Sequence, residues 1–570
     1  MSAAVSITGL GIICAIGNDT LSVLESLRSE ESGVGHLKYL DTVHRDIPAG
    51  EVKLSTEEMK KMLGVHTDAP LSRTSALGAI AVREAVRNSG ANLEGKRVAL
   101  ISGTTVGVMD ITEKYYERMK TDPSLQSLPH SNECGKSTLE IAELSGLGGV
   151  ECCTICTACS SALNSIMLGA EMLRRGEADL VIAGGSEPLS RYHFNGFNTL
   201  MILDRERCRP FDDTRDGLNL GEGAAFVVLE KDAPNSLAYV TGYANRCDAF
   251  HQTASSENGD GAFLSMSAAL QMAGLLPSDI QYINAHGTGT PNNDLSESRA
   301  IRRVFGENIP EVSSTKAFTG HTTSASGSIE TVICVLAMLN GFTPASLGFS
   351  NPIPGGILPT PGHSPVQLDN VLCNSFAFGG NDSSLVISRH PSALPPRDPG
   401  AFKAREVSRR RVDSIEGLAP IREFLSPMET RRMGKLMKAG LLSAFKALQE
   451  AGIECPDAIV TGTSRGMLEF STCFLDEIVA NGEEMLKPTL FMQSTHNTIA
   501  SAIAIRLGCH GYNITFSQGE ESAAWALRDA RRLIESGQAR NVLVCDFDEN
   551  VEGTATTSFH AQSIVLIRDE

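Results

Sequence analysis

The chain has 570 residues, of which 42% are hydrophobic and 20% charged, an ordinary balance for a globular protein that buries a sizeable core. Its 67 Asp and Glu outnumber its 49 Lys and Arg, and the resulting net charge of −18 argues against nucleic acid as a partner. No run approaches the ~18 apolar residues of a membrane span, and the N-terminus lacks the features of a signal peptide, so we expect a cytoplasmic protein without a membrane span.

Up to residue 390, short apolar runs alternate with longer segments of helical periodicity. This alternation predicts an α/β fold with parallel sheets covered by helices on both faces. The predicted helices lie at 163–175 and 329–339. The predicted strands lie at 98–102, 151–156, 180–183, 224–229, 281–284 and 384–388.

A run of small residues, Thr157 to Ala162, separates the strand at 151–156 from the helix at 163–175. Cys159 in this run would lie at a helix N-terminus, where the helix dipole favours thiolate over thiol. Backbone amides at the same turn can also face an oxyanion. Cys159 is therefore a candidate nucleophile.

The same region has the pattern C-C-x-x-C-x-x-C, formed by Cys152, Cys153, Cys156 and Cys159. Such a pattern can also indicate an iron–sulfur cluster or a zinc site. However, the period of two residues in a strand would send Cys153 and Cys156 to opposite faces. We therefore expect no metal here.

Three glycine-rich loops follow predicted strands or precede a predicted helix. The first, Asn284 to Thr290, contains His286. The second, Lys316 to Gly327, contains His321, and the third, Asn374 to Asn381, contains Phe378. Glycines allow tight turns that can point a side chain into a cleft. Any one of these loops alone would be unremarkable.

Proline and glycine gather after residue 388 and are followed by the basic run Arg409–Arg411. Because proline cannot join a central strand, we predict a linker at 391–415. Beyond it the sequence partly repeats the first half: Gly176 to Ala183 lines up with Gly537 to Val544, as do Ile101 to Thr105 with Val460 to Ser464. A repeat of this kind indicates duplicated architecture.

Taken together and in this order, the motifs resemble the β-ketoacyl synthase family of the thiolase-like superfamily over residues 3–388. Arg209 to Asp212 and Arg215 to Ala224 add to the match. The resemblance implies a five-layer αβαβα ketosynthase fold, with its N-terminal half at 1–250 and its C-terminal half at 251–390. It also implies an acyltransferase of fatty acid, polyketide or aryl-polyene biosynthesis.

By this resemblance, Cys159 accepts an acyl group from a carrier phosphopantetheine as a thioester. His286 and His321 promote the loss of CO₂ from a malonyl thioester, and the resulting carbanion attacks the acyl-cysteine. Two neutral imidazoles can donate hydrogen bonds to the developing enolate, whereas a carboxylate would repel the malonyl group.

The resemblance also assigns supporting residues and partners. Backbone amides of Cys159 and Phe378 would form the oxyanion hole, and Phe378 would act as a gate. The expected partners are acyl- and malonyl-loaded acyl carrier protein, with no other cofactor, and a homodimer or a pseudo-dimer with a ketosynthase-like partner. Lys316, held by Asp294 and Glu297, would order the site, and the contacts to the pantetheine arm would come from Thr288 and Thr290.

The segment 416–570 resembles the N-terminal part of a ketosynthase a second time. Glu520 aligns with the nucleophile, and no His-Gly-Thr-Gly-Thr loop follows. This copy should be inactive and resembles chain-length factors, the ketosynthase-like partners of some condensing enzymes. Two departures in the first copy, serines at 324 and 326 and the pair Asn381-Asp382, would alter the shape of the pocket.

Two other functions remain open at this point. A thiolase-type enzyme would use coenzyme A substrates and a second cysteine as base, which the two-histidine pattern argues against. A non-catalytic partner of another ketosynthase would fit the C-terminal segment but not an intact set of Cys159, His286 and His321.

Overall fold

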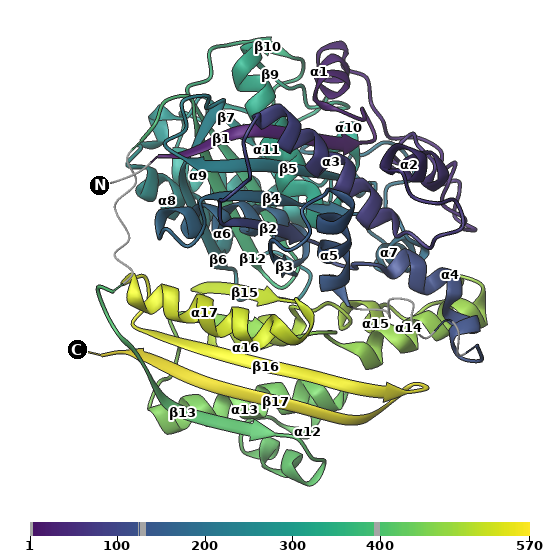
Figure 1. The fold of residues 1–570 in the computed structure, drawn as a ribbon, viewed down its shortest axis with the longest axis vertical. Coiled ribbons are helices and arrows are strands. Elements are labelled where there is room, and N and C mark those ends of the chain that lie inside the picture. Colours follow the sequence, from purple (N-terminus) through teal and green to yellow (C-terminus); the bar gives the residue numbers. More distant parts are fainter. Residues whose placement is uncertain (1–3, 123–124, 126–132, 393–399, 570) are drawn as a thin grey trace.

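The computed structural model describes residues 4–122, 125, 133–392 and 400–569 (Figure 1). Part of the expected linker, 393–399, lies outside the described residues. In the first half of the chain, strands follow the order β3-β2-β4-β5-β1, with β2 parallel to both neighbours and β5 antiparallel to both. Their bounds are β1 Val5–Cys14, β2 Val98–Gly103, β3 Glu151–Ile155, β4 Leu180–Glu187 and β5 Gly223–Lys231.

The next part of the chain repeats this arrangement in the order β8-β7-β11-β12-β6, with the same pattern of directions. A short antiparallel contact of β1 with β6 joins the two sheets. The strands predicted from the sequence are confirmed in both. The bounds are β6 Ala238–Cys247, β7 Tyr282–Asn284, β8 Glu311–Ser313, β11 Asn370–Ala377 and β12 Asn381–Ser388.

Helices complete five layers, which confirms the predicted fold class. α6 (Ser161–Arg174) and α11 (Ser326–Asn340) are almost wholly buried and lie between the two sheets. α3 (Arg73–Ser89) and α5 (Cys134–Leu144) cover the first sheet, and α8 (Asp260–Ala273) with α9 (Pro291–Phe305) covers the second. One helical stretch, Thr323–Asn340, is long and apolar enough to cross a membrane by composition, but 89% of it is buried inside the protein, as expected of a core helix.

The C-terminal domain repeats the first half-unit, in the order β15-β14-β16-β17-β13 and with the same strand directions. α13 (Lys435–Ala451) and α16 (Thr498–Leu507) pack on one face of this sheet and α17 (Ser522–Glu535) on the other. The predicted duplication is therefore present. The strand bounds are β13 Ala404–Val412, β14 Ala458–Gly462, β15 Tyr512–Phe516, β16 Asn541–Glu552 and β17 Ala555–Arg568.

The segment 391–415, expected to be a linker, contains a strand. This strand, β13, pairs with β17 along its whole length. The basic run that ends it is neutralised locally: Arg409 pairs with Glu406, Arg410 with Glu450 and Arg411 with Asp413. The many exposed charged side chains of β13 fit an edge strand in contact with solvent. A search for apolar runs does not detect such a strand.

The two domains meet through their equivalent strands, β3 and β15, which pair antiparallel (Figure 1). Cys156 N–H donates to the Thr515 carbonyl and Ser517 N–H to the Thr154 carbonyl, both at 2.9 Å. A local two-fold axis therefore relates the two N-terminal half-units, and within the described residues one sheet of 15 strands runs through both domains. The single chain contains a pseudo-dimer.

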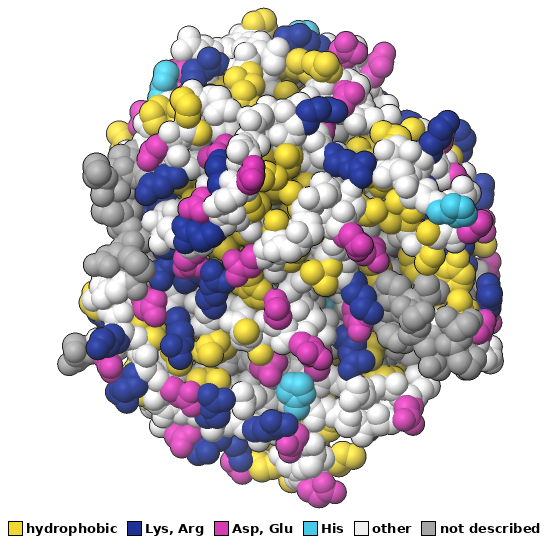
Figure 2. Space-filling model, viewed as in Figure 1, with side chains coloured by type: hydrophobic (Ala, Val, Ile, Leu, Met, Phe, Trp, Pro, Cys, Tyr) yellow, Lys and Arg dark blue, Asp and Glu magenta, His cyan; other side chains and the backbone are white. Residues whose placement is uncertain are grey.

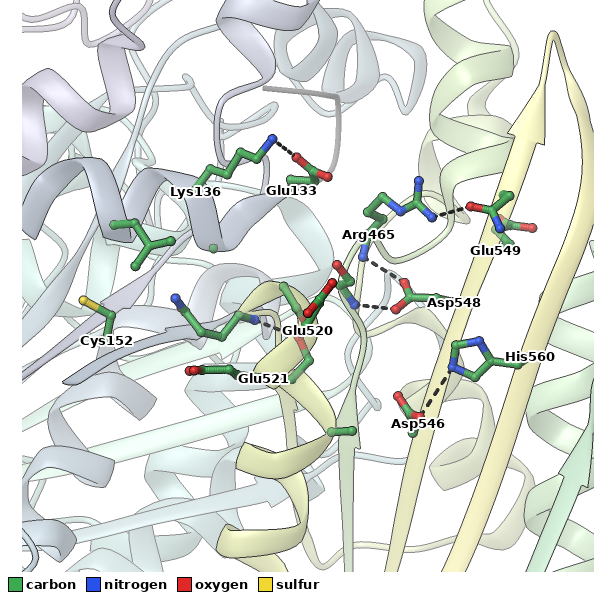
Figure 3. A pocket seen from close by; sticks show the side chains of 18 of the residues that line it. Glu133, Lys136, Cys152, Arg465, Glu520, Glu521, Asp546, Asp548, Glu549 and His560 are labelled. Atoms are coloured by element: carbon green, nitrogen blue, oxygen red, sulfur yellow. Dashed lines mark hydrogen bonds and ion pairs between the residues drawn. The ribbon is translucent and has the colours of Figure 1, made fainter. Parts of the chain in front are cut away.

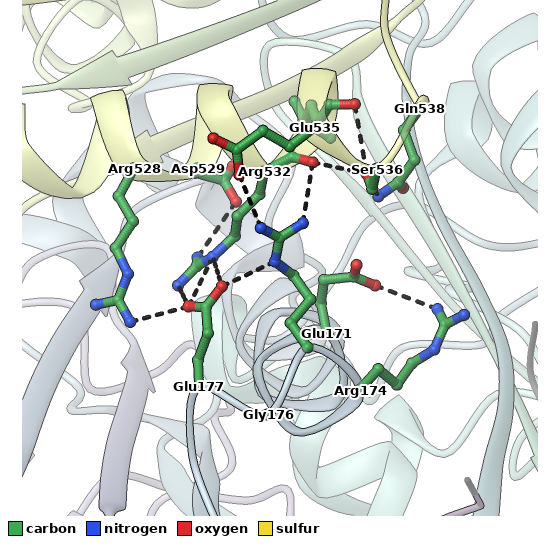
Figure 4. A network of polar contacts seen from close by, with 12 residues as sticks. Glu171, Arg174, Gly176, Glu177, Arg528, Asp529, Arg532, Glu535, Ser536 and Gln538 are labelled. Carbon is green, nitrogen blue, oxygen red and sulfur yellow. Dashed lines mark hydrogen bonds and ion pairs between the residues drawn. The ribbon is translucent and has the colours of Figure 1, made fainter. Parts of the chain in front are cut away.

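An arginine-rich ion-pair network lies beside this junction (Figure 4). Arg528 and Arg532 of α17 both bind Glu177, which follows α6 in the first domain. Arg175 pairs with Glu177 and also with Glu535 of α17. Burial alone would raise the pKa of Glu177, but the guanidinium groups of Arg532 and Arg528 lower it to about 2.

Shorter elements connect these layers. On the face drawn in Figure 2, acidic and basic side chains are interspersed, so the net charge is not concentrated there in one patch. The remaining elements are α1 Thr20–Ser29, α2 Thr56–Leu63, α4 Met109–Met119, α7 Arg191–Thr199, α10 Lys316–Thr319, β9 Phe342–Thr343, β10 Ser364–Pro365, α12 Pro427–Thr430, α14 Leu468–Asn481 and α15 Pro488–Met492.

Candidate active site

Cys159 lies in the short turn Ala158–Ser160 between β3 and α6. The turn is tight, because Ala158 has a φ of 51°, a left-handed conformation that is unusual for a residue with a side chain. The Ser161 hydroxyl accepts a hydrogen bond from Thr157 N–H at 2.9 Å and donates one to the Ala158 carbonyl at 2.6 Å. These bonds fix the direction of the Cys159 side chain at the start of α6.

Both predicted histidines lie beside this cysteine. His321 Nε2 is 3.2 Å from Cys159 Sγ, and His321 Nδ1 is 3.0 Å from the Ser326 hydroxyl. The ring of His286 approaches that of His321 edge-on, with their centroids 5.3 Å apart. The three loops recognised in the sequence thus converge on one point.

A cavity of about 450 Å³ opens at this point. The hydroxyls of Thr288 and Thr290 bond each other at 2.9 Å at its wall. Phe378 stacks on Phe197, with 5.7 Å between ring centroids, at another wall. The predicted residues that line the cavity are Cys159, His286, Thr288, Thr290, His321 and Phe378.

The predicted supporting residues lie behind the cavity. Glu297 accepts hydrogen bonds from the N–H groups of His286 and Gly287, each at 2.8 Å. Asp294 accepts one from Gly289 N–H at 3.1 Å, so the two carboxylates hold the histidine loop in place.

Lys316 is also buried, but its ion-pair partner differs from the expectation. It pairs with Glu330 of α11, whereas the sequence had suggested Asp294 and Glu297. Glu330 was missed because it is an acidic residue inside an apolar helix, and only the packing of α11 brings it to the lysine.

Burial controls the charges of the site. It lowers the pKa of His286 and of His321 well below the ordinary value, and the positive charge of Lys316 lowers both further. Burial also raises the pKa of Cys159 to about 12, although Lys316 and the N–H of Phe378 act in the opposite direction. The resting pair is therefore a neutral thiol beside a neutral imidazole, so burial outweighs the effect of the helix terminus that favoured a thiolate.

The C-terminal domain contacts the rear of this site, which no pattern in the sequence had indicated. Asn497 Nδ2, just before α16, donates a hydrogen bond to the Phe378 carbonyl at 3.0 Å. The following Gly379 is packed so closely that a Cβ there would lie 2.0 Å from the Ser501 hydroxyl. Phe491 of α15 packs against Phe197, with 5.6 Å between ring centroids.

The second domain reproduces the turn that holds Cys159, but without a cysteine. Ser522 accepts from Gln518 N–H at 2.9 Å and donates to the Gly519 carbonyl at 2.6 Å, as Ser161 does in the first copy. Gly519 has a φ of 56°, matching Ala158. These matching contacts place Glu520 at the position of Cys159, as the sequence comparison of the two copies predicts.

The turn with Glu520 faces an open hollow of about 1000 Å³ (Figure 3). Its polar lining includes Glu521 and the pair of Asp546 with His560, and Arg465 N–H donates to Asp548 at 2.9 Å. The second turn therefore opens onto charged side chains, and it has Glu520 where the first turn has a cysteine.

Comparison with known proteins agrees with this architecture. The model for the N-terminal domain of β-ketoacyl synthases matches residues 2–235, and the model for the C-terminal domain matches 237–350. A second model for the N-terminal domain matches residues 406–563. The chain belongs to the β-ketoacyl synthase family. It is accordingly a condensing enzyme of the acyltransferase class. Its ketosynthase domain is followed by a second, partial ketosynthase domain.

Two relatives cover the first of these ketosynthase domains. The 3-oxoacyl-[acyl-carrier-protein] synthase 2 of Vibrio cholerae is 30% identical over 418 residues, 68% of this chain and 99% of that protein. Nodulation protein E of Rhizobium meliloti is 33% identical over 416 residues, 68% of this chain and all of that protein.

Among solved structures, the ishigamide ketosynthase/chain length factor matches 68% of this chain and all of its own, with 30% identity and a TM-score of 0.63. The PfaC keto synthase-chain length factor is only 16% identical, but it matches all of this chain and 78% of its own with a TM-score of 0.79. The second comparison concerns the fold alone and extends over both domains of this ketosynthase.

Proposed function

We propose that Cys159 carries the growing acyl chain and that His286 and His321 catalyse decarboxylative condensation with a malonyl thioester. The observation that carries this proposal is the contact of 3.2 Å between Cys159 Sγ and His321 Nε2, with His286 beside them. For acylation, His321 Nε2 accepts the thiol proton as the sulfur attacks the incoming thioester, whose pantetheine thiol leaves. The N–H groups of Cys159 and Phe378 stabilise the oxyanion.

In the second half-reaction both imidazoles act as hydrogen-bond donors. Their depressed pKa values keep them neutral near pH 7, so each can donate an N–H to the malonyl thioester carbonyl. The malonyl C–C bond breaks, CO₂ leaves, and the enolate carbon attacks the acyl-cysteine carbonyl. The Cys159 thiolate is then the leaving group, and the new 3-oxoacyl chain remains on the pantetheine arm, which Thr288 and Thr290 contact.

The first test is substitution of the nucleophile. Cys159→Ala should reduce malonyl-dependent chain extension by at least about 10³-fold, because no other side chain of the cavity can form the thioester. Product formation and CO₂ release are measured together with purified enzyme and loaded acyl carrier protein. Cys14→Ala, a buried thiol on β1, is the control. Extension that survives in Cys159→Ala would refute the assignment, and extension without CO₂ would favour a thiolase.

We also propose that the C-terminal domain, 400–569, is a non-catalytic module that shapes the acyl pocket. Phe491 supports this role because it fills space behind Phe197, a residue of the cavity wall. It also packs directly on α7, where a Cβ on Gly196 would lie 2.2 Å from its ring. A wall supplied by the second domain would limit how far an acyl chain extends.

Phe491→Ala should therefore lengthen the product by at least one two-carbon unit. Removal of a buried phenyl ring leaves a space next to the pocket and costs about 3–5 kcal/mol of stability, so Phe491→Leu serves as a milder variant. Mass spectrometry of carrier-bound products measures the effect. Phe470→Ala in α14, which packs against a different core, is the control. An unchanged product distribution in both Phe491 variants would contradict the role.

The remaining partners follow from the same proposal. Acyl carrier protein delivers both substrates, and its phosphopantetheine is the one prosthetic group that the reaction uses. The pseudo-dimer takes the place of a homodimer at β3, because β15 already occupies the edge of this strand. All 14 cysteines are free, which fits a reducing compartment such as the cytoplasm.

A further inference from the structure

Three side chains that can bind a metal ion meet at the junction of the two domains. Cys134 begins α5, Cys156 follows β3, and His496 lies in the loop before α16. All three are buried, and their ligand atoms lie within 4.8 Å of one another. Within the described part of the chain, no other group of three His, Cys, Asp or Glu side chains has this spacing.

The local two-fold axis brings these residues together. A Cβ on Gly107 would lie 2.8 Å from Cys134 Cα, and a Cβ on Gly466 would lie 3.1 Å from His496 Cα. Cys134 and His496 therefore occupy equivalent positions in the two copies and face each other at the axis. Cys156 lies next to both, at the end of the strand that pairs the domains.

The distances suit zinc. Bonds of about 2.3 Å to sulfur and 2.0 Å to nitrogen give a tetrahedral S···N separation of about 3.5 Å and an S···S separation of about 3.8 Å. Cys134 Sγ and His496 Nε2 are 3.6 Å apart. The other two pairs are no more than 4.8 Å apart, so the S···S pair needs to close by at most about 1 Å and the S···N pair by at most about 1.3 Å.

The chemistry of the donors also fits. Two thiolates and a neutral imidazole are ligands typical of zinc, and two thiolates cancel the charge of the dication, so the buried site carries no net charge. The Thr105 carbonyl oxygen, 3.8 Å from Cys134 Sγ, is available as a fourth ligand. The run of four cysteines does not form the site, since Cys156 alone among them belongs to the trio.

We propose that Cys134, Cys156 and His496 bind one zinc ion that fastens the C-terminal domain to the strand leading to the nucleophile. Two ligands come from the ketosynthase domain and one from the C-terminal domain, so the ion crosslinks them. Cys156 lies three residues before Cys159, and the crosslink therefore also anchors the nucleophile turn. The role is structural and separate from the condensation chemistry.

The test uses the full-length chain, incubated with zinc sulfate and desalted, with zinc measured by mass spectrometry. The expected result is one zinc per chain, reduced to background in Cys134→Ser and in His496→Gln. Cys153→Ser, a buried thiol of β3 outside the trio, should retain it. X-ray absorption at the zinc edge should show two sulfurs at about 2.3 Å and nitrogen at about 2.0 Å.

A second measurement covers variants that fold poorly. Added zinc should raise the Tm of the wild-type chain, and a chelator should lower it again, because an ion that binds the folded state alone stabilises it. Background zinc in a folded, zinc-treated wild-type chain would overturn the proposal. So would zinc retention in both ligand variants, or a Cys134–Cys156 disulfide in the protein purified without reductant.

Discussion

Ser326 sets the hydrogen bonding of His321 at a position where the family pattern often has a glycine or alanine. Its hydroxyl is 3.0 Å from His321 Nδ1 and 3.2 Å from the Thr322 hydroxyl. A hydroxyl can donate or accept, so His321 can hold its proton on either ring nitrogen. In the proposed mechanism, it therefore accepts the thiol proton at Nε2 during acylation and presents an N–H from the same atom during decarboxylation.

Ser326→Ala should lower kcat by about tenfold with a smaller change in KM, because the imidazole loses the group that orients it. Steady-state kinetics over a range of pH measure this, and Ser326→Thr should recover most of the activity. Ser328→Ala, whose hydroxyl bonds the Ala325 carbonyl in the same helix, is the control. Equal losses in Ser326→Ala and Ser328→Ala would point to a general packing effect instead.

The cavity residues could be predicted because each belongs to a short motif at the end of a strand. Cys159, His286 and His321 each lie in a turn rich in glycine or small residues, and this turn is visible in the sequence. Glu330 could not be found in this way, since its pairing with Lys316 depends on how α11 packs. Asn497 could not be predicted either, because its contact with the Phe378 carbonyl exists only after the two domains dock.

At the scale of elements, α6 and α17 show how a half copy can be stable. α6 is buried along almost its whole length between two sheets, whereas α17 lacks a second sheet to cover it. The exposed Arg531 of α17 stands at the position where α6 has the buried Ala170. The helix is therefore amphipathic, and its outer face is suited to contact with solvent.

A thiol in the second copy should therefore remain inactive. Glu520→Cys, introduced into Cys159→Ala, should restore no malonyl-dependent CO₂ release, because His560 is the single histidine among the described residues that line the hollow beside it. The release of labelled CO₂ measures this, with the unmodified chain as the positive control. Recovery of even about 1% of wild-type activity would show that the hollow of Figure 3 retains catalytic groups.

The six strands and two helices that the sequence predicts are all present in the structure. Apolar strands such as β4 and the buried helix α6 have strong patterns, and the structure extends their predicted bounds by a few residues at most. β13 was hidden, because the signal of an edge strand with charged side chains is weak and the preceding prolines indicate a linker. Its assignment requires the partner strand β17, which lies over 140 residues later in the chain.

The whole molecule is built from three versions of one five-stranded unit, two in the ketosynthase and one in the C-terminal domain. The third version pairs with the first along β3 through its strand β15. Main-chain hydrogen bonds join the two domains at the axis, and the arginines around Glu177 join them beside it (Figure 4). This junction contains ion pairs as well as apolar contacts, so the stability of the fold should depend on pH.

The pKa of Glu177 is about 2 in the folded chain and about 4.3 for an unperturbed glutamate. Because folding lowers it, the carboxylate stabilises the fold above pH ~4.3, and this contribution falls as the pH drops toward 2. Glu177→Gln should cost about 2 kcal/mol at pH 7 and less at pH 3.5. Urea unfolding at both pH values measures the difference, with exposed Glu94→Gln as control. A cost that does not change with pH would contradict the proposed linkage.

The strand pairing of β3 with β15 within one chain changes how the enzyme is supplied. Two separate polypeptides must be made in matched amounts and come apart on dilution. Here the two domains are joined in one chain by the segment between β12 and β13. The effective concentration of one domain relative to the other is therefore about millimolar and does not depend on the concentration of the protein. Each translated chain therefore contains both domains in a one-to-one ratio. The domain with Cys159 does not need to associate with a separate polypeptide.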